Sequence, residues 1–237
     1  MSGIDSYDTL NIDLNNIEES IKIKKTQTNS LESYPHYDSE IKTLFSYPLG
    51  IFNYGKNFTY QEIDTLRQVK YVENLYNYIS DEKNILNYPS FFNIKKFINV
   101  CLIKYFNQVF VPKHNSELYV TESWLNKTIK GKFHHSHNHA NSIVSGVFYF
   151  KTVKDDKITF YKDKPNSPYI LVESESFNDY NSSLTNINVF EGQLLLFSSN
   201  MEHEVPQVNT DEERISLSFN TFIKGNINKT ISSSLIL

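Results

Sequence analysis

The feature that most constrains the fold is a change in hydrophobic period after Lys113. Before this point apolar residues recur at helical spacing, whereas the later runs alternate apolar and polar side chains. These runs are short and separated by polar turns, which is typical of an antiparallel β sandwich or jelly roll. They read ELYVTESWLNK, SIVSGVFYF, KITFY, GQLLLFSS and RISLSFNTFI.

Two helices and a strand are predicted upstream. Thr59 and Glu62 have capping-box spacing at the start of TYQEIDTLRQV. The segment from Ser90 to Phe110 carries an apolar stripe, which predicts a helix packed against a sheet. The Pro-Leu-Gly in FSYPLGIFNY predicts a short strand that ends in a turn. The stripe comprises Phe91, Ile94, Phe97, Ile98, Cys101, Leu102, Tyr105 and Phe106.

The domain organisation follows from where apolar residues gather. Residues 1–30 are polar with few aromatic residues and are predicted to form a flexible tail or a loosely docked segment. We expect one domain over 31–237, in which 31–113 supply strand and helical support and 114–237 form the β core. The polar segment 161–191 is long for a hairpin connection and would suit a lid over the mouth of the core.

Charge and cysteine content narrow the partners and the compartment. The formal net charge is -4 and the pI is about 6.0, which makes nucleic acid and anionic membranes poor candidates for the main partner. The single cysteine, Cys101, lies in the helical stripe and is predicted to be a buried, inert thiol in a reducing compartment. No apolar run approaches the roughly 20 residues that span a bilayer, and the N-terminus lacks a signal-peptide pattern. We therefore expect a cytoplasmic protein.

Four of the seven histidines fall within HHSHNH. In an extended segment side chains two apart share a face, so His135, His137 and His139 would point one way and His134 the other. Neutral imidazole binds Fe, Zn, Cu and Ni, and His203 is a candidate third ligand brought by the fold. A solvated histidine-rich turn would show the same pattern.

The last predicted strand has two different faces. Its apolar face carries Ile215, Leu217 and Phe219, and its polar face turns toward water or toward a lined cavity. The chain has two arginines against 21 lysines, and one of them, Arg214, belongs to this polar face. A guanidinium binds a carboxylate bidentately, which lysine cannot do. The polar face comprises Arg214, Ser216, Ser218 and Asn220.

In order and spacing, His137-x-His139, His203 and Arg214-x-Ser216 resemble the Fe(II)- and 2-oxoglutarate-dependent oxygenases. Those enzymes carry His-x-Asp, a distal His, and an Arg about ten residues later. Asn126 to Gly131 resembles the Asn-x-Tyr-x-x-Gly lead-in of alkylation-repair dioxygenases, with Thr128 in place of the tyrosine. The amino-acid sequence from Glu117 to Phe222 resembles more closely an uncharacterised 2-oxoglutarate/Fe(II) oxygenase-like family of phages and marine bacteria.

The departure from the general pattern lies at the metal, where His139 replaces the usual aspartate. A three-His site can bind Fe(II), Zn or Ni, with one negative charge fewer around the ion. Glu122 and Glu204 are possible carboxylate ligands, although Glu204 follows His203 directly and so faces the other side of a strand. His135 is an alternative to His139 as the partner of His137. The sequence does not indicate a function for His134, His36 or His114.

The resemblance implies a mainly β fold with helices, an α+β fold whose double-stranded β-helix, a cupin-like jelly roll, carries N-terminal helices on its major sheet. It implies that His137, His139 and His203 bind Fe(II), and that the far carboxylate of 2-oxoglutarate meets Arg214 and Ser216. With O₂ as co-substrate, the enzyme would hydroxylate a C–H bond and release succinate and CO₂.

The remaining site residues have weaker assignments. Tyr149 would share the face of His137 and could donate to the co-substrate, or it could fill the barrel interior. Asn126 is a further candidate for a co-substrate contact, and Trp124 is predicted to lie in the core.

Three classes of function stay open from the sequence. The first is the 2-oxoglutarate-dependent hydroxylase. The second is a three-His cupin-like metalloenzyme that does not use 2-oxoglutarate, and the third is a non-catalytic metal-binding β module. The expected substrate is a small molecule, amino acid or peptide. The compartment would be the host cytoplasm if a phage encodes the protein.

Overall fold

The computed structural model describes residues 40, 42, 46–162, 173–229 and 234–237. Residues 45–237 form one compact unit, and the fold given below is that of this unit. The expected tail at 1–30 lies outside the described residues, so its boundary stays a prediction. The elements are β1 (Leu49–Asn53), α2 (Tyr60–Gln68), β2 (Tyr71–Asn74), β3 (Asn77–Ser80), the short 3-10 helices η1 (Ile85–Asn87) and η2 (Pro89–Phe91), α3 (Phe92–Val109), β4 (Ser116–Thr128), β5 (His134–His137), β6 (Val144–Lys151), β7 (Lys157–Tyr161), β8 (Leu184–Asn188), β9 (Gln193–Ser198), β10 (His203–Val205), β11 (Arg214–Lys229) and β12 (Ser234–Ile236).

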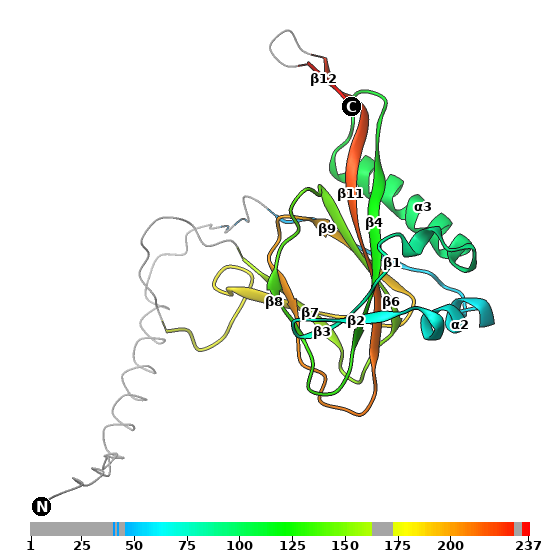
Figure 1. Ribbon diagram of the computed structural model, residues 1–237. Coiled ribbons are helices and arrows are strands. Elements are labelled where there is room, and N and C mark those ends of the chain that lie inside the picture. The colour runs from blue at the N-terminus through cyan, green and yellow to red at the C-terminus, as the bar shows by residue number, and fades with distance from the viewer. Residues whose placement is uncertain (1–39, 41, 43–45, 163–172, 230–233) are drawn as a thin grey trace, which may run out of the picture. The chain divides into compact units, whose positions relative to one another are not determined.

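Two antiparallel sheets form the core of the unit (Figure 1). The larger sheet has the order β1-β9-β6-β11-β4-β3-β2, with β12 paired to β11, and the smaller has the order β5-β10-β7-β8. Apolar side chains of both sheets meet in a shared cluster that includes Tyr149, Phe160 and Phe197. This is the jelly-roll architecture that the period-two runs predict, so the predicted fold class is confirmed.

The helices pack on the other face of the larger sheet, as predicted. Helix α2 begins at a complete capping box, in which the Glu62 amide donates to Thr59 Oγ1 at 3.2 Å and the Thr59 amide to Glu62 Oε2 at 2.6 Å. The predicted α3 stripe is buried, except that Phe97 is only partly buried. Cys101 lies within it, and burial raises the pKa of its thiol to about 11. The stripe packs against sheet residues such as Phe148, Leu217 and Phe219.

Strand β11 separates this helix-packed core from the space between the sheets. Ile215, Leu217 and Phe219 belong to the core under the helices. The polar residues of its other face are also buried, with Arg214 only 4% exposed, so that face lines the interior and not the solvent. The polar alternation of the sequence therefore marks a cavity wall.

Three details differ from the predictions. Pro48-Leu49-Gly50 opens strand β1 and does not end one, since proline suits the start of a strand. The β2–β3 hairpin was not predicted from the sequence, and it extends the larger sheet beyond β4. The polar segment 161–191 contains strand β8, which pairs with β7 from Lys157↔Asn188 to Tyr161↔Leu184. Residues 163–172 of that segment lie outside the described residues.

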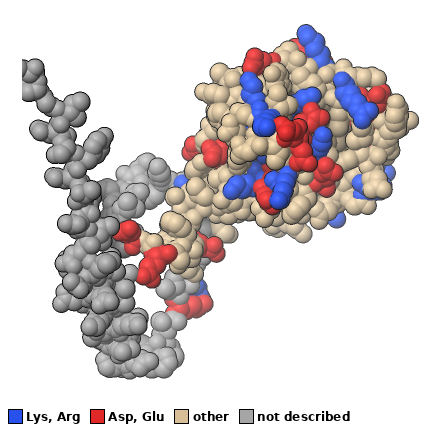
Figure 2. Space-filling view, turned by 90° about the horizontal axis from the view of Figure 1, so that it is seen from below, with Lys and Arg blue, Asp and Glu red and all other residues tan. Residues whose placement is uncertain are grey.

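The face of the protein in Figure 2 carries basic and acidic side chains side by side, with neither sign dominating. Opposite charges also form ion pairs in the protein. Examples are Lys132–Glu73 at 2.6 Å and Lys127–Glu213 at 3.0 Å. In the part of the chain that the structure describes, no helix is long and apolar enough to cross a membrane.

Candidate metal centre and co-substrate pocket

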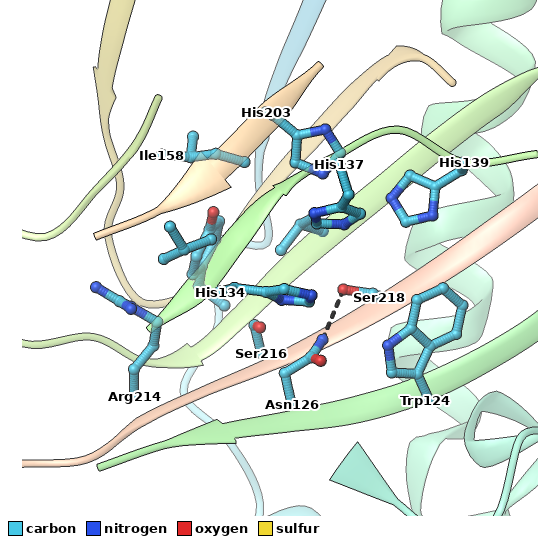
Figure 3. Close-up of a pocket in the computed structure, with 13 residues that line it drawn as sticks. Trp124, Asn126, His134, His137, His139, Ile158, His203, Arg214, Ser216 and Ser218 are labelled. Atoms are coloured by element: carbon cyan, nitrogen blue, oxygen red, sulfur yellow. Dashed lines mark hydrogen bonds between the residues drawn. The ribbon is translucent and has the colours of Figure 1, made fainter. Parts of the chain in front are cut away.

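A small pocket lies between the two sheets, with a volume of about 30 Å³ (Figure 3). Strands from both sheets contribute to its wall, because β4, β6 and β11 belong to the larger sheet and β5, β7 and β10 to the smaller. Histidines line one part of the wall, and Arg214 and hydroxyl and amide groups line another. The lining residues are Trp124, Asn126, His134, His137, His139, Val147, Tyr149, Ile158, His203, Val205, Arg214, Ser216 and Ser218.

Three of the imidazoles converge on one point. One nitrogen from each of His137, His139 and His203 lies within 4.8 Å of the others. His137 and His203 are direct partners in the pairing of β5 with β10. His139 follows β5 in a connection whose place is fixed by its backbone amide, which donates to the Ser199 carbonyl at 2.9 Å. The arrangement is compatible with a bound transition metal.

Hydrogen bonds fix the tautomers of two of these rings. His137 Nδ1 lies 2.8 Å from the His135 carbonyl, and His203 Nδ1 lies 2.9 Å from the Met201 carbonyl. A carbonyl only accepts, so each Nδ1 carries the proton and each Nε2 keeps a free lone pair. Backbone carbonyls orient metal-binding histidines in this way in known metal sites.

The environment also favours the neutral ligand form. Burial, and then the neighbouring His137, lower the pKa of His203 to about 3 and that of His139 to about 4. Burial lowers the pKa of His137 as well. Neutral imidazoles bind metal ions without first having to lose a proton.

Arg214 lies in the pocket wall, but it already has a partner that sequence reasoning missed. Its Nε donates to both carboxylate oxygens of Asp156, at 2.9 and 2.8 Å, and its Nη2 donates to Oδ1. Its Nη1 donates to the Pro206 carbonyl at 3.3 Å. The expected bidentate site for a carboxylate is thus filled by a carboxylate of the protein itself. Asp156 lies 58 residues from Arg214 in the sequence, and no local sequence pattern indicates that the two residues pair.

The polar wall next to Arg214 includes the other predicted co-substrate residues. Ser216 on β11 is flanked in register by Asn126 on β4 and by Tyr149 on β6. Asn126 Nδ2 donates to Ser218 Oγ at 2.8 Å. Among the described residues, the buried Tyr149 hydroxyl and Asn126 Oδ1 have no hydrogen-bond partner.

These two unpartnered groups fit a polar ligand in the pocket. The Tyr149 hydroxyl is a donor that an anionic oxygen would satisfy, and burial raises its pKa, so it keeps its proton. If the Asn126 amide were turned over, Nδ2 would face the pocket and Oδ1 would accept from Ser218. Three imidazoles beside such donors fit a metal ion with an anionic co-substrate.

His134 was predicted to face away from the other histidines, and this is wrong. His137 pairs with His203 but His134 pairs with Val205, so β5 carries one residue more than β10 between these pairs. This bulge reverses the alternation and turns His134 to the side of His137. Their rings stack with centroids 4.4 Å apart. His135 instead contacts Tyr76, with ring centroids 5.7 Å apart, and is not part of the pocket wall.

Trp124 was predicted to lie in the core, but it is partly exposed and lines the pocket, with its ring centroid 6.0 Å from that of His139. The candidate carboxylates have other contacts. Glu122 accepts from Asn220 Nδ2 at 2.8 Å, and Glu204 is hydrogen-bonded to Tyr161. Within the described chain, the group suited to a metal consists of the three histidines and has no carboxylate.

Part of the chain that includes this site is similar to a known protein family. Residues 122–220, which span all three histidines and Arg214, match a family model described as "Putative 2OG-Fe(II) oxygenase". The fold and this match make the chain similar to the 2OG-Fe(II) oxygenases, which are oxidoreductases. The resemblance predicted from the sequence is thereby confirmed, whereas the expected phage or marine origin stays a prediction. No sequence among the curated proteins matches.

Solved structures are similar to this chain at low sequence identity. HygX from Streptomyces hygroscopicus with nickel, 2-oxoglutarate and hygromycin B bound is 13% identical, with a TM-score of 0.52, over 74% of this chain and 82% of that chain. HygX with nickel and 2-oxoglutarate gives the same values. An oxidoreductase of the 2OG-Fe(II) oxygenase family from Burkholderia pseudomallei is 16% identical over 67% of this chain and 75% of its own, with a TM-score of 0.47.

Proposed function

We propose that this protein is an Fe(II)- and 2-oxoglutarate-dependent dioxygenase that hydroxylates a C–H bond of a small molecule, amino acid or peptide. The observation that carries the proposal is the convergence of three neutral imidazoles beside a buried polar wall with unpartnered groups. His137, His139 and His203 would hold the iron. Ser216, Tyr149 and Asn126 would bind the co-substrate, together with the two Arg214 N–H groups that Asp156 and Pro206 leave free.

The overall reaction converts R–H, 2-oxoglutarate and O₂ into R–OH, succinate and CO₂, and when bound the iron supplies the oxidising chemistry that this requires. The protein would hold Nε2 of His137 and His203 in place through their Nδ1 hydrogen bonds. The Tyr149 hydroxyl would donate a hydrogen bond to a carboxylate of the co-substrate and would stay protonated. The apolar residues Val147 and Ile158 in the wall would limit the entry of water.

Two observations bear on the kind of substrate. Trp124, partly exposed beside His139, offers an aromatic surface near the proposed metal. HygX, which shares the fold, holds hygromycin B in one of its structures. Both observations suit a small organic substrate.

A three-His metalloenzyme that does not use 2-oxoglutarate is the second candidate. The Arg214–Asp156 pair favours it, because the guanidinium is already neutralised by a buried carboxylate. The two candidates differ in whether metal-loaded protein binds 2-oxoglutarate.

An anaerobic titration of Fe(II)-loaded protein with 2-oxoglutarate separates them, with the visible metal-to-ligand charge-transfer band as the readout. The dioxygenase predicts a saturable band that disappears in His203→Ala, and succinate formation once O₂ is admitted. The matched control is His114→Ala, which removes a histidine from the connection between α3 and β4 and should leave the band unchanged. Stoichiometric metal binding with no band at any 2-oxoglutarate concentration would favour the second candidate.

A further inference from the structure

We propose that the His134 side chain closes the co-substrate pocket and must turn out of it before 2-oxoglutarate binds. This inference rests on the function proposed above. It concerns the space that His134 occupies and not its protonation.

His134 lies between the two groups that the co-substrate has to join. Figure 3 shows its ring between the three-His cluster on one side and Arg214 on the other, above Asn126 and Ser216. The ring stacks on that of His137 at 4.4 Å with an interplanar angle of 15°, and both residues line the same pocket as Arg214. A ligand that reaches from the metal ligands to Arg214 has to cross this space.

The space left beside the ring is too small for the co-substrate. The pocket measures about 30 Å³, which is room for about two or three water molecules, since each needs roughly 10–15 Å³ of cavity volume. 2-Oxoglutarate is a five-carbon dicarboxylate and is far larger. Removal of the imidazole from the pocket would open a continuous path along the polar wall formed by Ser216, Asn126 and Tyr149.

His134 is positioned so that it can move. Strand β5 has four residues and forms the edge of the smaller sheet, so only one side of it is paired. The bulge interrupts even that pairing between His137 and His134. In the described structure the His134 ring stacks on His137 and lies tilted against His135, but it has no hydrogen bond. His137 and His203, by contrast, are tied to backbone carbonyls.

The consequence for binding is a population effect. If the pocket is open in only a fraction of molecules, the apparent affinity for 2-oxoglutarate is reduced by that fraction. His134→Ala removes the ring, so the whole population becomes competent. We expect its apparent Kd to fall about tenfold or more, which corresponds to an open fraction of about 10% or less in the native protein.

The test is the anaerobic 2-oxoglutarate titration on Fe(II)-loaded protein, with absorbance at the charge-transfer band and fluorescence of Trp124, the single tryptophan, as two independent readouts. Four proteins are compared: the native chain, His134→Ala, His134→Phe and the control His114→Ala. Phenylalanine keeps a ring in the pocket but offers no nitrogen to a metal. It therefore separates a space-filling role of His134 from a role as a displaceable ligand.

The expected result is tighter binding in His134→Ala, with His134→Phe as weak as the native chain or weaker and His114→Ala unchanged. Equal or weaker binding by His134→Ala would overturn the inference, while the native band would leave the dioxygenase proposal standing. If His134→Phe bound as tightly as His134→Ala, the space-filling explanation would be wrong. Failure of all four proteins to bind 2-oxoglutarate, with iron bound, would overturn the dioxygenase proposal itself and this inference with it.

Discussion

Arg214 and Asp156 form a buried ion pair, with side chains 5% and 0% exposed. Asp156 also accepts from the backbone amide of Lys157 at 2.9 Å, so this pair ties the start of β7 to the start of β11. The ion pair thus joins strands of the two different sheets.

Substitution of either member of this pair will destabilise the fold. Loss of one partner leaves a buried charge without compensation, which costs about 3–5 kcal/mol. We expect Arg214→Ala and Asp156→Ala each to lower the free energy of unfolding by about this amount in urea titrations. The double variant Arg214→Met/Asp156→Leu should lose much less, because it leaves neither charge unpaired.

The exposed pair Lys130–Asp211 provides the control, because Lys130→Ala should leave the unfolding midpoint unchanged within error. A native-like midpoint for Arg214→Ala would contradict the prediction. The double variant is also the better reagent for co-substrate binding. Weak binding in Arg214→Ala alone would mix a lost contact with a damaged fold.

His139 stands where most of these oxygenases carry aspartate, and we expect His139→Asp to keep Fe(II) binding. His139→Ala should weaken it by at least roughly tenfold, since even the loss of a hydrogen bond to a ligand costs 10- to 100-fold. Anaerobic equilibrium dialysis with metal analysis measures both variants. Unchanged metal affinity in His139→Ala would remove His139 from the ligand set and point to His134 in its place.

The buried histidines predict a loss of stability in acid for the metal-free protein. Burial is the main cause that lowers the pKa of His203 to about 3 and that of His139 to about 4, from an ordinary value of 6.5. Between these values the unfolded chain binds more protons than the folded chain, so the free energy of unfolding rises with pH in this window. Stability is therefore complete above about pH 6.5 and is lost as the pH falls toward about 4.

Each such imidazole contributes a slope of up to about 1.4 kcal/mol per pH unit. Urea titrations across the window measure the slope for the native chain and for His203→Ala, which should show a shallower one. The same slope in both proteins would mean that His203 is not held in its neutral form by the fold.

Tyr149→Phe should act in opposite directions on stability and on binding. In the residues that the structure describes, the Tyr149 hydroxyl is buried without a partner, which costs about 1–3 kcal/mol. Its removal should therefore raise the unfolding temperature of the metal-free protein. The same change should weaken 2-oxoglutarate binding in the anaerobic titration, because the donor is lost. A lower unfolding temperature would show that the hydroxyl has a partner in the folded protein, and unchanged binding would show that it has no role toward the ligand.

Periodic patterns in the sequence predicted much of the fold. The α3 stripe and the alternation of β11 were read correctly, because each reflects one buried face of one element. Strand β8 was missed because its LTNIN sequence has little apolar content and its residues are mostly exposed. Its position depends on pairing with β7, which is a tertiary property.

The candidate site was predictable only where local spacing decides which way a side chain points. His137 and His139 were found from their spacing and His203 from its place after a strand, and the structure brings their nitrogens together. The position of His134 depends on a one-residue bulge, and nothing local in the sequence indicates it. Asp156 escaped notice because its partner comes from a distant strand.

Substitutions on the two faces of β11 should have different effects in a cell. A substitution at Leu217 or Phe219 disturbs the packing beneath the helices and should reduce the amount of folded protein in a cell. A substitution at Ser216 or Ser218 changes the cavity wall and should leave protein levels near normal while it alters ligand binding. A saturation library read for both abundance and catalysis would therefore show the two phenotypes alternating residue by residue along this one strand.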